Sequence, residues 1–434
     1  MRLASGWLIG ALAGLGAFIG CSSGASDGSV SVDPNDAGNT EAGAIPGDAG
    51  TGASDAAVTP AFKPEMPQIS FDGGALLTAA EIVTVTWTAD PNAKAFEAFG
   101  DAIGTSDYWK PLAEYGIGAA TSGSARHVEI TDAPKASMTE DEIDTFVGEH
   151  VAAAPGNGWP TLTPQSVYVI YTPPTMKVTA SGANDCESTD GYHDETTSSS
   201  LTHIVYAVVL ESCHDTADVV QFSTAIASHE IVESATDPHT QTDLGWTGFD
   251  ADHLAWDIWQ AQQDEVADAC EYYDDADYQE GAPFDYQVQQ FWSNASAAAG
   301  HSPCLKAPIL PYFNTTPLDV EAIAVTTTAT KTDAVNTKGF RIGVGASRTV
   351  RYGFYGDGDK GPWALQIVEG DGFTKPETPH LTITTDKTAG SNGDIANVSI
   401  TINSVGAKTG ILMTAISTRG SESLHYMPVL IGAY

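Results

Sequence analysis

Basic residues are scarce in this sequence. The 434 residues include 18 Lys and Arg against 56 Asp and Glu, which gives a formal net charge of −38 at pH 7. Nucleic acids are polyanions that bind proteins chiefly through Lys and Arg, so this balance excludes a nucleic-acid-binding protein. An acidic surface instead favours cations or basic substrates as partners.

Long apolar runs are also lacking, apart from one at the N-terminus. That run extends from Trp7 to Ile19, which is too short and too rich in glycine for a good membrane span. It leads into Phe18-Ile-Gly-Cys21, which resembles a bacterial lipobox. The resemblance implies a lipoprotein signal peptide over residues 1–20, a lipid on Cys21, and export to the outer membrane or cell surface. A secreted protein with an incidental cysteine is the alternative.

Large apolar side chains are almost absent from residues 22–65, which consist mainly of Gly, Ala, Ser, Asp and Pro. Such a segment cannot bury enough surface to fold. We therefore expect a disordered tether over residues 21–65, and membrane association through the lipid alone. Residues 66–434 are enough for two domains, which we predict over 66–309 and 310–434.

Cysteine is rare as well, and its count is informative. Besides Cys21 the sequence contains Cys186, Cys213, Cys270 and Cys304. An even number of cysteines in an exported protein indicates two disulfides, for which three connectivities are open. We favour the sequential pairing.

The order of elements predicts two kinds of architecture. Apolar, β-branched runs at 81–87, 127–130, 166–171 and 203–210 alternate with helical segments, one of which opens with a capping box at Thr139-Glu-Asp-Glu142. This predicts an α+β domain with a mixed sheet. From about residue 311 short Val-, Ile- and Thr-rich runs recur between turns, which predicts an all-β Ig-like sandwich.

One helical turn carries the chemistry. His229-Glu230-Ile-Val-Glu233 lies in a predicted helix from about 216 to 235, which Pro238 ends. Residues four apart share a helix face, so His229 and Glu233 can bind one cation, and Glu230 can act as general base. The pattern is that of the zinc-peptidase H-E-x-x-H helix with Glu in place of the second His.

A catalytic zinc needs a third protein ligand, and several placements compete. His239 has metzincin-like spacing, although no Met lies between Met176 and Met413 to form the Met-turn of that group. We favour Glu265, because Glu265-Val-Ala-Asp268 resembles the second helix of thermolysin-like gluzincins. That resemblance makes Asp268 a partner of the far nitrogen of His229. Further alternatives are Asp237, Asp250 and His253. A His-Glu-Glu set suits zinc, with manganese or calcium also allowed.

The central segment as a whole resembles a known group of proteins. The elements Val167–Pro174, Gly191-Tyr192-His193, Ser228–Pro238, Glu265–Cys270 and Val288–Asn294 occur in this order. They resemble a group of bacterial secreted proteins with a His-Glu-x-x-Glu helix, which are distantly similar to the plant phosphate-induced, EXORDIUM-like family. The resemblance implies a zincin-like fold and a metallopeptidase-type site.

The Gly191-Tyr192-His193 segment lies in a predicted loop. Tyr192 or His193 near a zinc could stabilise the oxyanion of a tetrahedral intermediate. The sequence therefore predicts a surface-anchored, zinc-dependent metallopeptidase acting on peptides or proteins. The alternative is a catalytically inactive protein that keeps the zincin fold for extracellular or cell-wall binding.

Overall fold

The protein is described by a computed structural model, which covers residues 61–180, 183–184, 186, 189–213, 218–260, 265–305, 312–326, 334–358, 361–404, 410–420 and 424–433. Residues 58–434 form one compact unit. The predicted signal peptide, Cys21, most of the predicted tether and the predicted boundary at 309/310 lie outside the described residues. Among the described residues, no helix is long and apolar enough to cross a bilayer.

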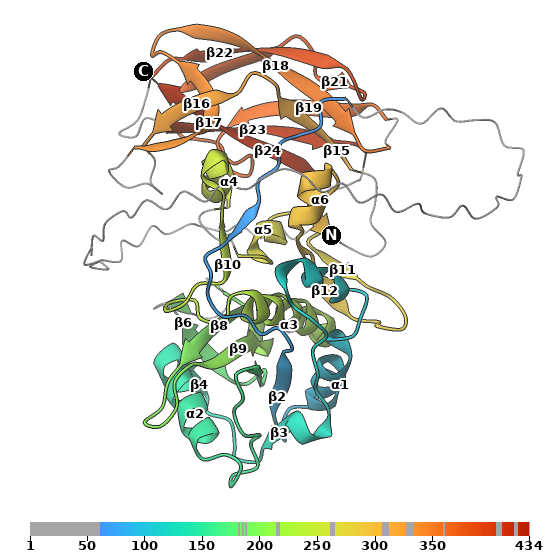
Figure 1. Ribbon diagram of the computed structural model, residues 1–434, viewed down its shortest axis with the longest axis vertical. Coiled ribbons are helices and arrows are strands. Elements are labelled where there is room, and N and C mark those ends of the chain that lie inside the picture. The colour runs from blue at the N-terminus through green and yellow to red at the C-terminus, as the bar shows by residue number, and fades with distance from the viewer. Residues whose placement is uncertain are drawn as a thin grey trace, which may run out of the picture. The chain divides into compact units, whose positions relative to one another are not determined.

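A five-stranded sheet organises the first half of the compact unit (Figure 1). Its strand order is β3 (His127–Ile130), β2 (Glu81–Trp87), β5 (Ser166–Thr172), β9 (Ile204–Leu210) and β8 (Gly191–Thr196). The first four strands are parallel, and β8 pairs antiparallel with β9 at the sheet edge. The strands predicted at β2, β3, β5 and β9 are confirmed. The segment predicted as a loop at residues 191–193 is instead the start of β8.

Helices cover both faces of this sheet, because its strands alternate apolar side chains between two cores (Figure 1). Helices α1 (Ala93–Ile103) and α3 (Val219–Thr236) pack on one face, and α2 (Glu140–Ala152) packs on the other. The predicted capping box is confirmed, since the side chain of Thr139 accepts from the Glu142 amide and Glu142 accepts from the Thr139 amide.

Short elements surround α3 and the sheet. The remaining helical segments of this half are η1 (Lys110–Tyr115), η2 (Ser124–Arg126), η3 (Glu211–Cys213), η4 (Ala251–His253), α4 (Leu254–Trp259), α5 (Asp268–Glu271) and α6 (Asn294–Ala299). The small sheets are β4 (Ser137–Thr139) with β6 (Lys177–Ala180) and β7 (Ala183–Asn184), β1 (Ile69–Phe71) with β10 (Trp246–Phe249), β11 (Asp277–Gln279) with β12 (Gln287–Gln289), and β13 (Phe291–Trp292) with β14 (Cys304–Leu305).

The second half consists of two sheets (Figure 1). One contains β15 (Phe313–Pro317), β18 (Ser347–Gly356), β22 (Ile395–Ile402) and β20 (Leu381–Thr385) in that order. The other contains β16 (Glu321–Val325), β17 (Val335–Ile342), β24 (His425–Ala433), β23 (Gly410–Thr418), β19 (Trp363–Glu369) and β21 (Ala389–Gly390). Aromatic contacts between Phe340 and Tyr352, and between Phe354 and Trp363, join the two sheets across their core. The succession of short strands predicted from about residue 311 onward is confirmed.

The two halves make direct contacts. Leu254 of α4 packs with Ile323 and Leu430, and its amide donates to the hydroxyl of Thr337. Residues 61–65 correct the predicted extent of the tether, because Ala61, Phe62 and Glu65 contact the second half. The ring of Phe62 lies against Gly353, which has no side chain to obstruct it. The folded unit therefore begins before residue 66.

Two disulfides join cysteines within the first half. Cys186 pairs with Cys213, and Cys270 pairs with Cys304. This is the sequential pairing that the sequence analysis favoured.

Candidate metal centre

Helix α3 lies at the centre of the first half, and every residue from Ser223 to Thr236 is buried. The helix ends where Asp237 precedes Pro238, since a residue before proline disfavours the helical conformation. His229 and Glu233 are one turn apart on the same face, as the sequence predicts. They are 9% and 3% exposed, so two ionisable groups lie almost entirely away from water.

His229, Glu233 and Asp268 bring three potential ligand atoms together. The Nε2 atom of His229 lies 3.0 Å from Oε2 of Glu233 and 3.5 Å from Oδ1 of Asp268. Ligand atoms about 2.0–2.1 Å from a tetrahedral zinc ion are separated by roughly 3.3 Å. The observed separations lie on either side of that value, so the three side chains fit one metal ion.

Strand β8 completes the cluster from the other side. The Nδ1 atom of His193 lies 3.4 Å from Oε2 of Glu233 and 3.5 Å from Oε2 of Glu230. Gly191, on the same face of β8, allows this approach, because a Cβ there would lie 2.3 Å from a methyl of Ile226 and 2.9 Å from Oε1 of Glu230. His193, Glu230 and Glu233 form a second set of potential ligands that shares Glu233 with the first.

The structure places Asp268, and not the predicted Glu265, beside the metal-facing nitrogen of His229. Asp268 faces Nε2 of His229, the nitrogen that also faces Glu233, and therefore lies at a ligand position. Glu265 lies 3.4 Å from Nε2 of His193 instead. The difference arises because Asp268 is the first residue of α5, whereas Glu265 precedes the helix and bridges to Thr247 of β10.

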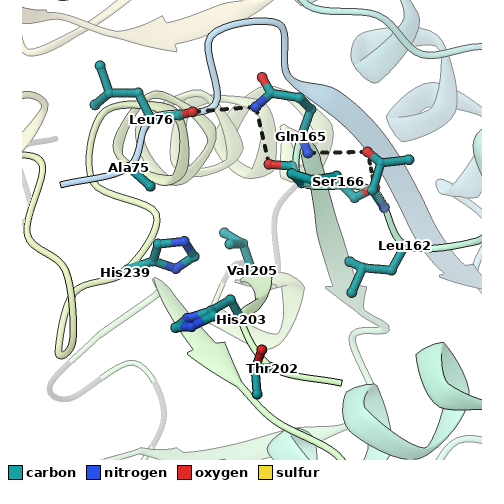
Figure 2. A pocket seen from close by; sticks show the side chains of 11 residues that line it. Ala75, Leu76, Leu162, Gln165, Ser166, Thr202, His203, Val205 and His239 are labelled. Carbon is teal, nitrogen blue, oxygen red and sulfur yellow. Dashed lines mark hydrogen bonds between the residues drawn. The ribbon is translucent and has the colours of Figure 1, made fainter. Parts of the chain in front are cut away.

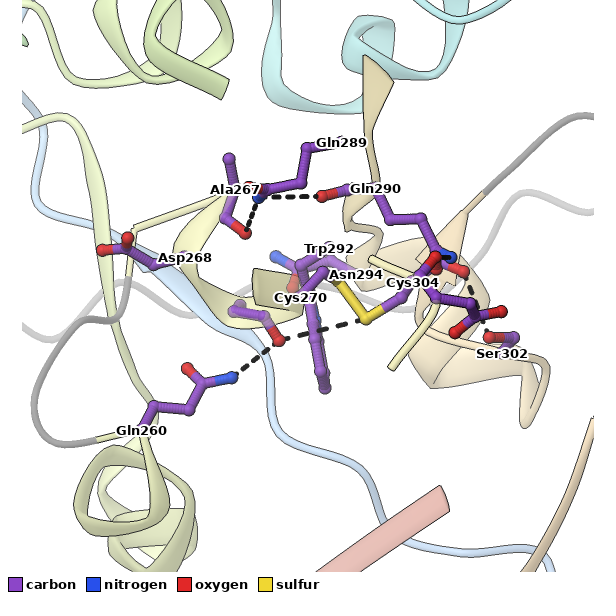
Figure 3. Close-up of a disulfide and its surroundings, with 12 residues drawn as sticks. Gln260, Ala267, Asp268, Cys270, Gln289, Gln290, Trp292, Asn294, Ser302 and Cys304 are labelled. Carbon is purple, nitrogen blue, oxygen red and sulfur yellow. Dashed lines mark hydrogen bonds between the residues drawn. A yellow bond between two sulfur atoms is a disulfide. The ribbon is translucent and has the colours of Figure 1, made fainter. Parts of the chain in front are cut away.

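A disulfide and two glutamines hold α5 in place (Figure 3). Cys270, which is two residues after Asp268, is joined to Cys304 of β14. The side-chain amide of Gln260 donates to the carbonyl of Ala269 at 2.6 Å, and the side-chain amide of Gln289 donates to the carbonyl of Ala267 at 3.1 Å. The backbone amide of Asp268 in turn donates to Oε1 of Glu233 at 3.0 Å. The helix that carries Asp268 is thus fastened on both sides of that residue.

The cluster contains more acidic than basic groups. Burial opposes the charged form of both histidines, but the neighbouring carboxylates outweigh it and raise the pKa of His193 and of His229 well above their usual range. Burial also opposes ionisation of Glu233, yet the two histidines hold its pKa below the usual range.

The other carboxyl groups of the cluster have less positive charge beside them to offset the cost of burial. Burial raises the pKa of Glu230, of Asp268 and, further, of Glu265. No Lys or Arg is an ion-pair partner of these carboxylates in the part of the chain that the structure describes. Buried charge of one sign is costly unless it is paired or coordinates a metal, so the cluster is suited to a divalent cation.

Tyr192 does not reach the cluster, which corrects its predicted role in transition-state support. Neighbouring residues of a strand point to opposite faces, so Tyr192 packs with Tyr206 beneath α2 while His193 faces α3. His193 itself lies in the cluster, in contact with Glu230 and Glu233.

The alternative third ligands lie elsewhere. His239 contacts Glu195, in a separate group with His203. Asp250 and His253 pair with each other at 2.7 Å. The carboxylate of Asp237 accepts from the backbone amide of Gly245 at 2.7 Å, and its carbonyl lies 3.3 Å from Nε2 of His193.

Comparison with known proteins adds no assignment. No protein family and no curated protein matches the sequence of this chain. Among solved structures, a Bacteroides ovatus GH5 xyloglucanase in complex with a XXXG heptasaccharide aligns at 10% identity over 22% of this chain and 17% of that chain, with a TM-score of 0.15. A match with this TM-score carries no information about the fold or the function of this chain.

Proposed function

We propose that this chain is a metal-dependent hydrolase of the metallopeptidase type, with a zincin-like first half and an Ig-like sandwich as its second half. The observation that carries the proposal is the position of His229 Nε2, 3.0 Å from Glu233 and 3.5 Å from Asp268, beside Glu230. The mixed sheet with its antiparallel edge strand next to the helix of the motif supports it.

His229, Glu233 and Asp268 are the residues that we expect to hold the metal. Zinc suits the imidazole, and the two carboxylates also allow manganese or calcium. When bound, such an ion supplies a Lewis acid that polarises a carbonyl oxygen and acidifies a water molecule.

Glu230 is the general base in this proposal. Its carboxylate is almost fully buried, and burial raises its pKa, which brings the group closer to the range in which it can both take up and return a proton. His193, 3.5 Å away, fixes the position of the carboxylate. Glu230 would take a proton from the attacking water and pass it to the leaving amine.

The position of β8 supports a peptide as substrate. In the described residues β8 pairs with β9 alone, and its other edge has no strand partner. An extended peptide can add to such an edge through main-chain hydrogen bonds. His193 on this strand would then lie close to the bound peptide.

Hydrolysis of casein and of a fluorogenic peptide library, with and without added zinc, tests the proposal. Replacing Glu230 by Gln keeps the size of the side chain and removes the base. We expect activity to fall by about 10²–10⁴-fold while metal binding is retained. Glu149→Gln, an exposed position on α2, serves as the matched control and should keep full activity. Undiminished hydrolysis by the Glu230→Gln variant would refute the assignment.

A second candidate function is favoured by the low exposure of the cluster. The side chains of His229 and Glu233 are 11% and 4% exposed, as in a structural metal site that is closed to substrate. The protein would then use this fold for extracellular or cell-wall binding without catalysis. A hydroxamate probe separates the two functions, because it binds a metal with an open position and not a closed site.

A further inference from the structure

A second group of potential metal ligands lies apart from the α3 cluster. Glu195 is near the end of β8, His203 immediately precedes β9, and His239 lies in the turn after α3. One carboxylate oxygen of Glu195 lies 2.8 Å from Nδ1 of His203 and 3.0 Å from Nδ1 of His239. The two imidazole rings lie side by side, with centroids 4.6 Å apart (Figure 2).

The 3.0 Å separation fits a common ion, and the 2.8 Å separation, which is a hydrogen bond without a metal, is slightly shorter than such an ion would set. Two ligand atoms about 2.1 Å from a metal are roughly 3.0 Å apart at a right angle and 3.4 Å apart at the tetrahedral angle. The buried Nδ1 atom of His239 has no hydrogen-bond partner among the described residues, although it lies 3.0 Å from Glu195. This is the arrangement expected when two lone pairs point at a third atom and not at each other.

The backbone of His203 supports the same interpretation. Its φ is +58°, a conformation that non-glycine residues seldom adopt. Strained backbone conformations of this kind cluster at functional sites. Here the conformation accompanies an imidazole that is half exposed at the surface and whose Nδ1 faces Glu195.

A hydrogen bond orients the carboxylate of Glu195 for metal binding. Thr242 donates its hydroxyl to Oε1 of Glu195, which fixes the orientation of the carboxylate and leaves Oε2 facing both imidazoles. Outer hydrogen bonds of this type are common behind metal ligands.

A cavity gives this group access to small molecules. It has a volume of about 490 Å³, and both His203 and His239 line it, opposite Leu162 and Gln165 (Figure 2). An ion held by three side chains here would keep coordination positions free on the cavity side.

We propose that Glu195, His203 and His239 bind a divalent transition-metal ion at a site separate from the α3 cluster. The two sites share no residue. Glu195 and His193 lie two residues apart on the same face of β8, about 6.7 Å by strand geometry. Two imidazoles and one carboxylate form a softer donor set than the carboxylate-rich α3 cluster. The second site therefore prefers zinc over calcium or manganese.

Zinc titration of the tag-free, metal-stripped full chain, with bound metal counted by mass spectrometry, tests the proposal. We expect two zinc ions per chain in the wild type and one in His203→Ala, with zinc affinity of the second site reduced at least 10-fold. Calcium should not compete at this site. His301→Ala is the matched control, because His301 is similarly exposed and faces a single carboxylate, Asp357. It should still bind two ions.

The same titration on other variants keeps this inference distinct from the proposed function. His229→Ala should lose the other ion and keep the one at Glu195. If only His203→Ala loses an ion, the proposed function fails and the second site stands. Unchanged zinc stoichiometry and affinity in His203→Ala would overturn the second site. Glu195→Gln, which keeps the size of the side chain, shows whether a loss in His203→Ala comes from misfolding. Unchanged zinc binding by Glu195→Gln would overturn the second site as well.

Discussion

The two halves of the compact unit bury different kinds of polar group. In the first half, the buried polar side chains include ionisable ones: Asp90, Glu97, Glu211, His229, Glu230, Glu233 and Asp237. In the described residues of the second half, the buried polar side chains are neutral: Asn314, Thr315, Thr316, Thr337, Thr414 and Ser417. Both halves need polar groups in their cores, but only the first half accepts the cost of burying charge there.

The neutral groups of the second half satisfy one another. Ser417 donates to Asn314 and Thr315, and the indole of Trp363 donates to Thr315 at 3.0 Å. Charged pairs in this half, such as Arg351 with Asp319, lie at the surface. This arrangement serves packing, whereas four of the buried ionisable residues of the first half, His229, Glu230, Glu233 and Asp237, lie on α3 or at its end and indicate function.

The first half is also the half with covalent reinforcement. Both disulfides lie within residues 186–304, and the sequence has no cysteine beyond Cys304. Because uncompensated buried charge destabilises a fold, crosslinks that restrict the unfolded chain offset part of that cost. The comparison therefore predicts that substitutions of buried charge in the first half have the largest effects.

Replacing Glu233 by Ala should have the largest effect on stability. The substitution leaves His229 and His193 buried without their shared carboxylate. We expect the free energy of unfolding of the metal-free protein to fall by about 3–5 kcal/mol. Urea unfolding followed by circular dichroism, in the presence of a chelator, measures the change.

The matched control is Asp319→Ala in the second half, which breaks an exposed pair with Arg351. Pairs of this type contribute about 0.2–1 kcal/mol. Equal losses for the two variants would mean that the buried cluster contributes no more than a surface ion pair, and the contrast between the halves would be lost.

Removing the disulfide near the cluster should have the next largest effect. In the double variant Cys270→Ala and Cys304→Ala, a loop with a sequence separation of 34 is no longer closed. We expect a loss of roughly 2–4 kcal/mol in the free energy of unfolding. Zinc affinity should fall as well, because the crosslink holds α5 and Asp268 beside Glu233. Calorimetric titration at a temperature where the variant is folded measures the affinity.

The corresponding variant without Cys186 and Cys213 is the control for that second effect. If both double variants lose the same zinc affinity, the crosslink at Cys270 acts on overall stability and not on the position of Asp268.

The sequence predicted those parts of the site that depend on local spacing. His229, Glu230 and Glu233 lie within one helical turn, so the period of the helix alone places them together. The capping box at Thr139 and the strands β2, β3, β5 and β9 have equally local signals. These predictions are confirmed. The sequence sufficed for them because each depends on residues that are close together in the chain.

The parts that the sequence missed depend on contacts between distant segments. Strand β8 reads Gly-Tyr-His-Asp-Glu-Thr and has no run of apolar residues, so pairing with β9 and not its own pattern makes it a strand. Its alternation then separates Tyr192 from His193. Glu195, His203 and His239 come from three segments with no characteristic spacing, and the start of α5 decides between Glu265 and Asp268.

Replacing Glu211 by Gln should have a smaller effect, and one of opposite sign. Glu211 is fully buried, and the amide of Asn92 donates to its Oε2 at 3.0 Å. Its Oε1 has no hydrogen-bond partner in the described part of the chain. Burial, together with the charge of Asp90, raises the pKa of Glu211 to about 9.

A carboxyl whose pKa is raised by folding stabilises the protein fully below its ordinary pKa of 4.5, and this contribution is lost as the pH rises through about 9. Because Gln cannot ionise, Glu211→Gln should be more stable than the wild type by about 1–3 kcal/mol at pH 8, and by much less at pH 5. Urea unfolding at both pH values measures the difference. Asn314→Ala, in the neutral core of the second half, should lose about 1–3 kcal/mol equally at both pH values. If the gain in the free energy of unfolding of Glu211→Gln does not grow with pH, Glu211 is not held protonated by the fold. The buried ionisable groups would then not make the stability of the first half depend on pH.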